Sequence, residues 1–177
     1  KTLNAAEMMN NTGKIISRDI YTAKLKLIEN EMRRLGITNV KVEEYDAAKL
    51  DDSLIDKADY VIADVPCSGL GIIRRKPEIK YNKTNINDIT EIQYQILENG
   101  SKYLKQGGEL VYSTCTTNIE ENYELINRFL NNNKNYVLAD ISDNIDEYFE
   151  TAKKGYVEIY PHLNGMDGFF IAKIKRI

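Results

Sequence analysis

Residues 14–36 read KIISRDIYTAKLKLIENEMRRLG, and this stretch contains one complete strand-then-helix unit. Its first part, residues 14–18, is a short run with β-branched side chains that is typical of a strand, and Asp19 follows at the carboxyl end. In residues 20–35 the apolar side chains recur three or four positions apart, which is helical spacing, and Gly36 ends the helix. A strand followed by such a helix predicts an α/β fold.

The same alternation continues along the rest of the chain. Further strands are predicted at 39–44, 58–63 and 109–113, and further helices at 3–11, 86–104 and 119–130. The tail has two more candidate strands, 156–160 and 168–175, whose connection is too short for a helical crossover, so we expect them to pair antiparallel. The sequence therefore predicts one doubly wound α/β domain over residues 1–177, with a mostly parallel sheet and an antiparallel C-terminal hairpin.

Composition narrows the class of protein. The chain has 177 residues, of which 42% are hydrophobic and 29% charged, enough apolar material for a core of its own. No apolar run approaches the ~18–20 residues of a membrane span, and no secretory leader is recognisable, so we expect a cytoplasmic protein that does not enter the membrane. Two cysteines fit a reducing compartment rather than a disulfide scaffold. A net charge of −3 argues against coating nucleic acid through bulk charge, although a local basic patch remains compatible with it.

Three acidic residues follow predicted strands: Asp19, Asp46 and Asp64. In open α/β sheets, ligands bind beyond the carboxyl ends of the strands. A carboxylate in such a place can accept both hydroxyl groups of a ribose, which makes Asp19 a candidate nucleoside ligand. The alternative is that each acid caps the helix that follows it.

Both cysteines are also expected at this edge of the sheet. Cys67 lies in DVPCSGLG (64–71), a glycine-rich segment after one strand, and Cys115 lies in STCT (113–116) after another. A helix beginning near Ile119, capped by Thr116 or Asn118, would favour a thiolate on Cys115 through its dipole. We therefore expect both thiols to face one cleft, although a free cysteine is more often a small buried hydrophobe.

A basic run lies between the two cysteines. Arg74, Arg75 and Lys76 follow one another in a predicted loop and are candidates for contacts with the phosphates of a polynucleotide. The alternative is an ordinary solvated surface run. His162, the one histidine, is more typical of a structural role, and no Cys/His spacing resembles a zinc site, so no metal is expected.

Four motifs, found in order on these predicted elements, resemble those of the Sun-type RNA (cytosine-5) methyltransferases, which include the bacterial enzyme acting on 16S ribosomal RNA. They are DVPCSGLG (64–71), IRRKP (73–77), YSTCT (112–116) and DGFF (167–170). The resemblance covers essentially the whole chain. The family usually has alanine at the position of Val65 and serine at that of Thr116, and both changes are mild.

The resemblance implies a Rossmann-like methyltransferase fold with S-adenosylmethionine as cofactor, and methyl transfer to C5 of a cytosine in 16S ribosomal RNA. It implies that Asp19 holds the ribose, Asp46 lies near the adenine, and Asp64 lies near the methionine end and the target base. Cys115 matches the nucleophile that forms a covalent adduct with C6, and Cys67 matches a second cysteine that helps release the product. Spacing alone does not choose between the thiols, because DNA cytosine-5 methyltransferases use a Pro-Cys motif after this strand.

One departure from the family lies at the first residues. The family has a strand and a Gly-Gly-Lys-Thr loop before the first helix, and Lys1-Thr2 looks like the last two residues of that loop. We therefore expect Lys1 to belong to the cofactor loop and the central strand of the sheet to be missing. A sheet with two unpaired edges would pair with another copy or bind S-adenosylmethionine poorly.

Other functions stay open at this point. A nicotinamide-dependent oxidoreductase also places an acid after a strand, but the Gly-x-Gly-x-x-Gly loop is absent and the tail hairpin does not fit. A non-catalytic RNA-binding module would need neither thiol. Within the same chemistry, the substrate could be transfer RNA instead of ribosomal RNA.

Overall fold

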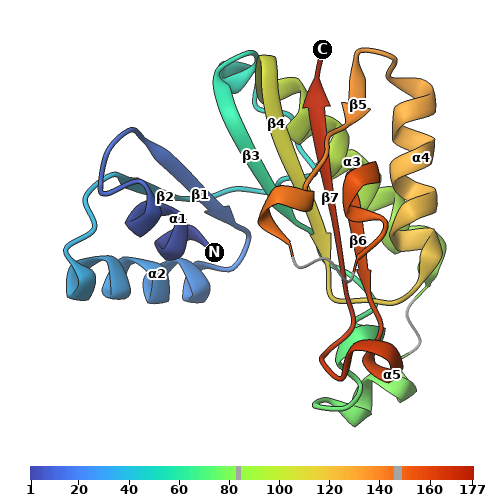
Figure 1. Ribbon diagram of the computed structural model, residues 1–177. Coiled ribbons are helices and arrows are strands. Elements are labelled where there is room, and N and C mark those ends of the chain that lie inside the picture. Colours follow the sequence, from blue (N-terminus) through green and yellow to red (C-terminus); the bar gives the residue numbers. More distant parts are fainter. Residues whose placement is uncertain (83–84, 146–148) are drawn as a thin grey trace. The chain divides into compact units, whose positions relative to one another are not determined.

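The computed structural model describes residues 1–82, 85–145 and 149–177. The chain forms two compact units, residues 1–47 and residues 48–177, and each is described by itself. In both units strands and helices alternate, which confirms the α/β class (Figure 1).

The first unit is a small strand–helix–strand module preceded by a helix. Its elements are α1 (Thr2–Met8), β1 (Ile15–Asp19), α2 (Thr22–Leu35) and β2 (Val40–Glu44). The two strands pair in parallel, as a helical crossover requires, and Gly36 ends α2 in the left-handed conformation (φ +66°). Its core contains the buried residues Ala6, Ile37 and Val40.

The second unit is built on a mixed sheet. Its elements are β3 (Ala58–Asp64), α3 (Ile86–Tyr103), β4 (Leu104–Thr114), α4 (Tyr123–Asn132), β5 (Tyr136–Leu138), β6 (Tyr156–Ile159), α5 (Pro161–Asn164) and β7 (Phe169–Arg176). The strand order is β3-β4-β7-β5, and β6 also pairs with β7. The β3–β4 pair is parallel, whereas every pair with β7 is antiparallel.

One hydrophobic core holds this sheet to its helices. Side chains with no exposed surface come from α3, β4, α4 and β7; among them are Leu97, Leu110, Tyr112, Phe129 and Phe170. Phe129 on α4 packs edge-on against Tyr94 of α3, and Tyr112 packs edge-on against Phe170 across the β4–β7 pair. The same core includes Ala63 near the carboxyl end of β3 and Tyr112 near that of β4, the strand ends that Asp64, Cys67 and Cys115 occupy or follow.

The predicted antiparallel pairing of the two tail strands is confirmed by the register of β6 with β7. The sequence did not indicate β5, because a three-residue strand carries almost no periodicity. The helix predicted at 119–130 is a short 3₁₀ turn, Ile119–Glu121, followed by α4; the backbone of Asn122 (φ −113°, ψ −108°) separates them. Among the residues that the structure describes, no helix is long and apolar enough to cross a membrane.

Candidate active site

The two cysteines lie against each other. Cys67, in the loop after β3, has its Sγ 3.2 Å from the Sγ of Cys115, which follows β4 directly. Both thiols are free and partly buried. Because β3 and β4 are parallel, their carboxyl ends reach the same edge of the sheet, and the loops that leave them bring the two thiols together.

The sulfur contact makes the protonation of each thiol depend on that of the other. The hydrogen bond with Cys115, together with burial, raises the pKa of the Cys67 thiol far above its ordinary range. Cys67 therefore keeps its proton at neutral pH. In this contact either sulfur can be the donor and the other the acceptor.

The backbone on either side of Cys67 is held by two polar side chains. Ser68 donates its N–H to Glu121 Oε2 at 2.8 Å and its hydroxyl to Glu121 Oε1 at 2.5 Å. On the other side, the Gln93 amide nitrogen donates to the carbonyl of Pro66 at 2.8 Å and to Glu121 Oε2 at 2.9 Å. Pro66 and Ser68, the two neighbours of Cys67, are thus hydrogen-bonded to the buried side chains of Gln93 and Glu121.

Asn122 holds the backbone around Cys115 in a similar way. The Thr114 hydroxyl donates to Asn122 Oδ1 at 2.6 Å, and Asn122 Nδ2 donates to the carbonyl of Thr116 at 3.0 Å. Asn118 caps the 3₁₀ turn that follows, since its side chain accepts from the N–H of Glu120. These bonds explain why the helix predicted from residue 119 is interrupted at Asn122.

A third segment, the tail around Gly168, is hydrogen-bonded to the loop of Cys67, which in turn is hydrogen-bonded to that of Cys115. The N–H of Gly71 donates to the carbonyl of Cys115 at 3.0 Å, and the N–H of Gly168 donates to the carbonyl of Gly71 at 2.8 Å. A Cβ atom on Gly71 would lie only 2.1 Å from the oxygen of Gly168, so this crossing requires glycine. Through it the DGFF and DVPCSGLG motifs meet.

Asp64 ends β3 and is exposed. Its carboxylate accepts a hydrogen bond of 3.2 Å from the hydroxyl of Ser113 on the neighbouring strand β4. Asp64 therefore belongs to the same strand edge as the two thiols.

The other candidate cofactor residues belong to the first unit. Asp19 ends β1, and its carboxylate accepts from the N–H of Tyr21 at 2.9 Å and from Lys24 Nζ at 3.1 Å. The Tyr21 bond shapes the turn before α2, but the N-cap of that helix is Tyr21, which has no side-chain capping hydrogen bond, so Asp19 does not cap α2. Asp46 lies two residues beyond the end of β2 and is half-buried, and Lys1 is exposed at the start of α1.

The basic run lies on the tail hairpin. Arg75 Nε is 2.7 Å from Asp167 Oδ2, Arg74 Nη2 is 3.5 Å from Asp167 Oδ1, and Arg74 also reaches the carbonyl of Gly165. Both arginine side chains stay mostly exposed, and Lys76 is exposed as well. Asp167 thus partly neutralises two of the three candidate RNA-binding charges.

Gln93, Glu121 and Asn122 were not singled out in the sequence. A signal existed for Gln93, which lies four residues from Ile89 and four from Leu97, in the apolar stripe of a helix. A polar residue in such a stripe is buried and needs a partner. Glu121 and Asn122 carry no comparable signal, since polar residues are ordinary in the first turn of a helix such as the one predicted at 119–130.

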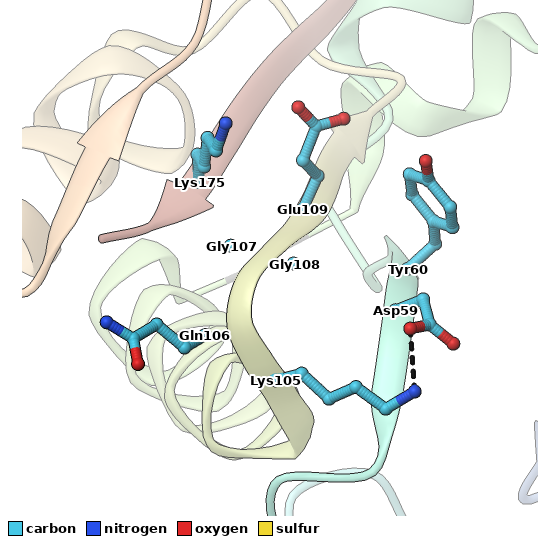
Figure 2. A pocket seen from close by; sticks show the side chains of 8 residues that line it. All are labelled: Asp59, Tyr60, Lys105, Gln106, Gly107, Gly108, Glu109 and Lys175. Atoms are coloured by element: carbon cyan, nitrogen blue, oxygen red, sulfur yellow. Dashed lines mark hydrogen bonds and ion pairs between the residues drawn. The ribbon is translucent and has the colours of Figure 1, made fainter.

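A pocket of about 390 Å³ lies away from these residues, near the start of β3 (Figure 2). Its lining includes Asp59 and Lys105, which form an ion pair of 2.7 Å, but none of the candidate site residues. Within the described ranges, no three His, Cys, Asp or Glu side chains gather in a way that could hold a metal ion.

Comparison with known proteins finds relatives that are named as ribosomal RNA small subunit methyltransferases. The probable ribosomal RNA small subunit methyltransferase B of Bacillus subtilis is 37% identical over 182 residues, covering 99% of this chain and 40% of that protein. The ribosomal RNA small subunit methyltransferase F of Aeromonas hydrophila is 31% identical, covering 99% of this chain and 38% of that protein. The chain thus spans about two fifths of the length of the curated relatives it matches.

Solved structures agree with the sequence relatives. The crystal structure of NSun6 from Pyrococcus horikoshii with SFG matches with a TM-score of 0.84 and 34% identity, over 99% of this chain and 44% of that one. This likeness confirms the Rossmann-like methyltransferase fold expected from the motifs. The profile of the family described as 16S rRNA methyltransferase RsmB/F matches residues 1–175. The resemblance read from the four motifs is therefore confirmed, and the chain belongs to the RsmB/F family of 16S rRNA methyltransferases.

Proposed function

We propose that the protein to which this chain belongs transfers a methyl group from S-adenosylmethionine to C5 of a cytosine in 16S ribosomal RNA, in the cytoplasm. The observation that carries the proposal is the 3.2 Å contact between Cys67 and Cys115, in a chain whose family profile is that of 16S rRNA methyltransferases. The relatives' names and the SFG-bound structure of a similar protein support the substrate and the cofactor class. We further propose that residues 1–177 act as one methyltransferase domain.

Two thiols suit this reaction because C5 of cytosine is a poor nucleophile. The thiolate of Cys115 adds to C6, which makes C5 enamine-like and able to attack an electrophilic methyl group. A base then takes the C5 proton, and the electrons of the C5–H bond restore the C5–C6 double bond as the Cys115 sulfur leaves as a thiolate. Cys67, which holds its proton beside Cys115, is suited to assist that release. Asp64 at the same edge would hydrogen-bond the base and stabilise the adduct.

The cofactor residues are proposed from the family and from their chemistry. When bound, S-adenosylmethionine would supply a methyl group activated by a sulfonium. A carboxylate offers about four lone-pair positions, and Asp19 uses two of them, for Tyr21 and Lys24, so acceptors remain for both ribose hydroxyls. Asp46 near the adenine and Lys1 in the cofactor loop complete the proposed set.

The RNA has to present an unstacked cytosine, because C5 and C6 must both be reached. Arg74, Arg75 and Lys76, whose side chains are exposed, would contact phosphates beside the flipped nucleotide. Their partial neutralisation by Asp167 indicates that they position the RNA instead of supplying most of its affinity.

The experiment uses the complete protein and 16S ribosomal RNA that carries 5-fluorocytidine, which blocks loss of the C5 substituent and traps the adduct. We expect a covalent protein–RNA band with wild type and with Cys67→Ala, and no band with Cys115→Ala. A band lost only in Cys67→Ala would reverse the roles of the cysteines. Absence of a band in all three proteins, together with no methylation of unmodified RNA, would contradict the proposed function.

A further inference from the structure

We infer that Glu121 is a positioning residue, which holds Cys67 against Cys115 through Ser68 and Gln93. The inference rests on the proposed function and adds to it a residue whose described side-chain hydrogen bonds go to neighbours of the two cysteines, and which does not touch the RNA in the reaction proposed. It follows from where the Glu121 carboxyl group is buried and from what surrounds it.

The side chain of Glu121 has no exposed surface. Every hydrogen bond that the structure describes for its carboxyl oxygens comes from a neutral donor: Ser68 N, Ser68 Oγ, Gln93 Nε2, Thr116 Oγ1 and Asn118 Nδ2. Burying a carboxyl group without a cationic partner is unfavourable unless hydrogen bonds compensate for the lost water. Five donors offset that loss here, and together they fix the direction of both carboxyl oxygens, which points to a geometric role.

Two of these donor residues, Ser68 and Thr116, come from the two cysteine loops. Ser68 directly follows Cys67, and Thr116 directly follows Cys115. The two hydroxyl groups also contact each other at 2.8 Å. Glu121 thus lies at the point where the loops meet, one residue beyond each thiol, and it sets how far apart the two backbones can be.

Gln93 completes the hold on Cys67 from the other side. Its amide nitrogen bridges the carbonyl of Pro66 and Glu121 Oε2, while its buried Oε1 has no hydrogen-bond partner in the described part of the chain. The amide is oriented for its two acceptors even though its own oxygen is left unpaired. Cys67 is therefore fixed between Pro66 and Ser68, and Cys115 is not held by Glu121 to the same degree.

The variant that tests the inference is Glu121→Gln, which keeps the volume of the side chain. Its amide nitrogen must replace one carboxyl oxygen, so a donor would face the donors of Ser68 or Gln93. Ser68 loses an acceptor in either orientation, and we expect Cys67 to move away from Cys115. Tyr136→Phe is the matched control, because it also removes one buried hydrogen bond, from the Tyr136 hydroxyl to the carbonyl of Ser101, in a different part of the core.

The first measurement needs no RNA. The rate at which iodoacetamide alkylates Cys67 in the complete protein is followed across pH by mass spectrometry of the Cys67 peptide. In wild type we expect the midpoint of this profile well above that of an ordinary thiol, and in Glu121→Gln a shift of at least about one pH unit toward the ordinary value near 8.5. Greater access alone would raise the rate at every pH and leave the midpoint in place. An unshifted midpoint would overturn the inference.

The second measurement separates the reaction steps on unmodified 16S ribosomal RNA. Since Cys67 is proposed to assist release, Glu121→Gln should accumulate the covalent adduct and lower kcat about tenfold or more, with the KM for RNA changed less than about twofold. Tyr136→Phe should show none of these effects. A loss confined to KM, or equal losses in both variants, would overturn the inference.

Two further results keep the test decisive. If Glu121→Gln does not fold, Ser68→Ala removes the 2.5 Å bond to Glu121 and is expected to shift the Cys67 alkylation midpoint in the same direction. If wild type neither forms an adduct nor methylates RNA, the proposed reaction fails, while the alkylation profiles still decide whether Glu121 positions Cys67.

Discussion

The N–H of Gly168 donates to the carbonyl of Gly71 at 2.8 Å, and the two backbones approach so closely that neither residue has room for a side chain. A Cβ atom on Gly168 would lie 2.8 Å from the Cα of Gly71 and 2.6 Å from a methyl carbon of Thr117. This crossing joins the loop of Cys67 to the tail hairpin. The packing of the site therefore requires glycine at both positions.

Gly71→Ala should therefore destabilise the protein by about 1–3 kcal/mol or more and abolish methylation, because the new Cβ would meet backbone atoms that have no space to move. Urea unfolding and a methylation assay measure the two effects. Gly100→Ala is the control: its Cβ would meet only the ends of Leu110 and Val61 at 3.2 and 3.3 Å, and these side chains can shift. Equal effects of both substitutions would contradict this account.

Mild oxidation should join Cys67 to Cys115. The sulfurs are 3.2 Å apart and need to approach by only about 1.1 Å to reach a disulfide bond length of roughly 2.05 Å. With diamide as the oxidant, which takes up the two thiol protons and two electrons, we expect loss of both free thiols, a mass decrease of two hydrogens and loss of methylation. Dithiothreitol should restore all three. If oxidation produced only disulfide bonds between molecules and none within one, the two thiols would not meet in solution.

Arg75→Ala should weaken RNA binding and lower the slope of log Kobs against log salt by about 0.7, as expected for one lost phosphate contact on single-stranded RNA. The reduction in affinity should be similar for different RNA sequences, because a phosphate contact carries no sequence information. Arg128 is a matched control, since it is also exposed and also paired with an acid, Glu91. An unchanged slope in Arg75→Ala, or the same change in Arg128→Ala, would contradict a specific contact between Arg75 and an RNA phosphate.

The stability of Glu158→Gln relative to wild type should increase as the pH rises. Burial on β6 raises the pKa of Glu158 above 4.5, so the folded state binds a proton more tightly than the unfolded chain. Stability then falls as pH increases from 4.5 through the raised pKa, because the charged form is disfavoured in the fold. A glutamine is neutral throughout, so its advantage should grow across that window and then stay constant. Urea midpoints measured from about pH 4 to about pH 7 should show this divergence; parallel curves would exclude it.

Much of the fold could be predicted from the sequence because its signals are local. Strand-then-helix alternation, Gly36 as a helix end and the short connection between β6 and β7 each depend on neighbouring residues. The three-residue strand β5 could not be predicted, since it exists only through its pairing with β7. The interruption at Asn122 likewise depends on Thr114, at the end of β4, and on Thr116 in the loop that follows it.

The candidate site likewise has features that the sequence could predict and features that it could not. The meeting of Cys67 and Cys115 could be anticipated, because parallel strands place their carboxyl ends at one edge. The choice of Cys115 as nucleophile rests on the family alone, because either sulfur can be the donor in the contact between the two thiols. The role of Glu121 could not be anticipated, since its partners are 53 residues away at Ser68 and 28 away at Gln93.

The position of β7 in the sheet has a consequence for the order of events during synthesis. This strand is the last element of the second unit, yet it lies between β4 on one edge and both β5 and β6 on the other (Figure 1). On a ribosome, β5 and β6 emerge with no strand to pair with until residues 169–176 follow, and Gly168 reaches Gly71 only then. The crossing of Gly168 with Gly71, which joins the loop of Cys67 to the tail hairpin, can therefore form only after β7 has been synthesised.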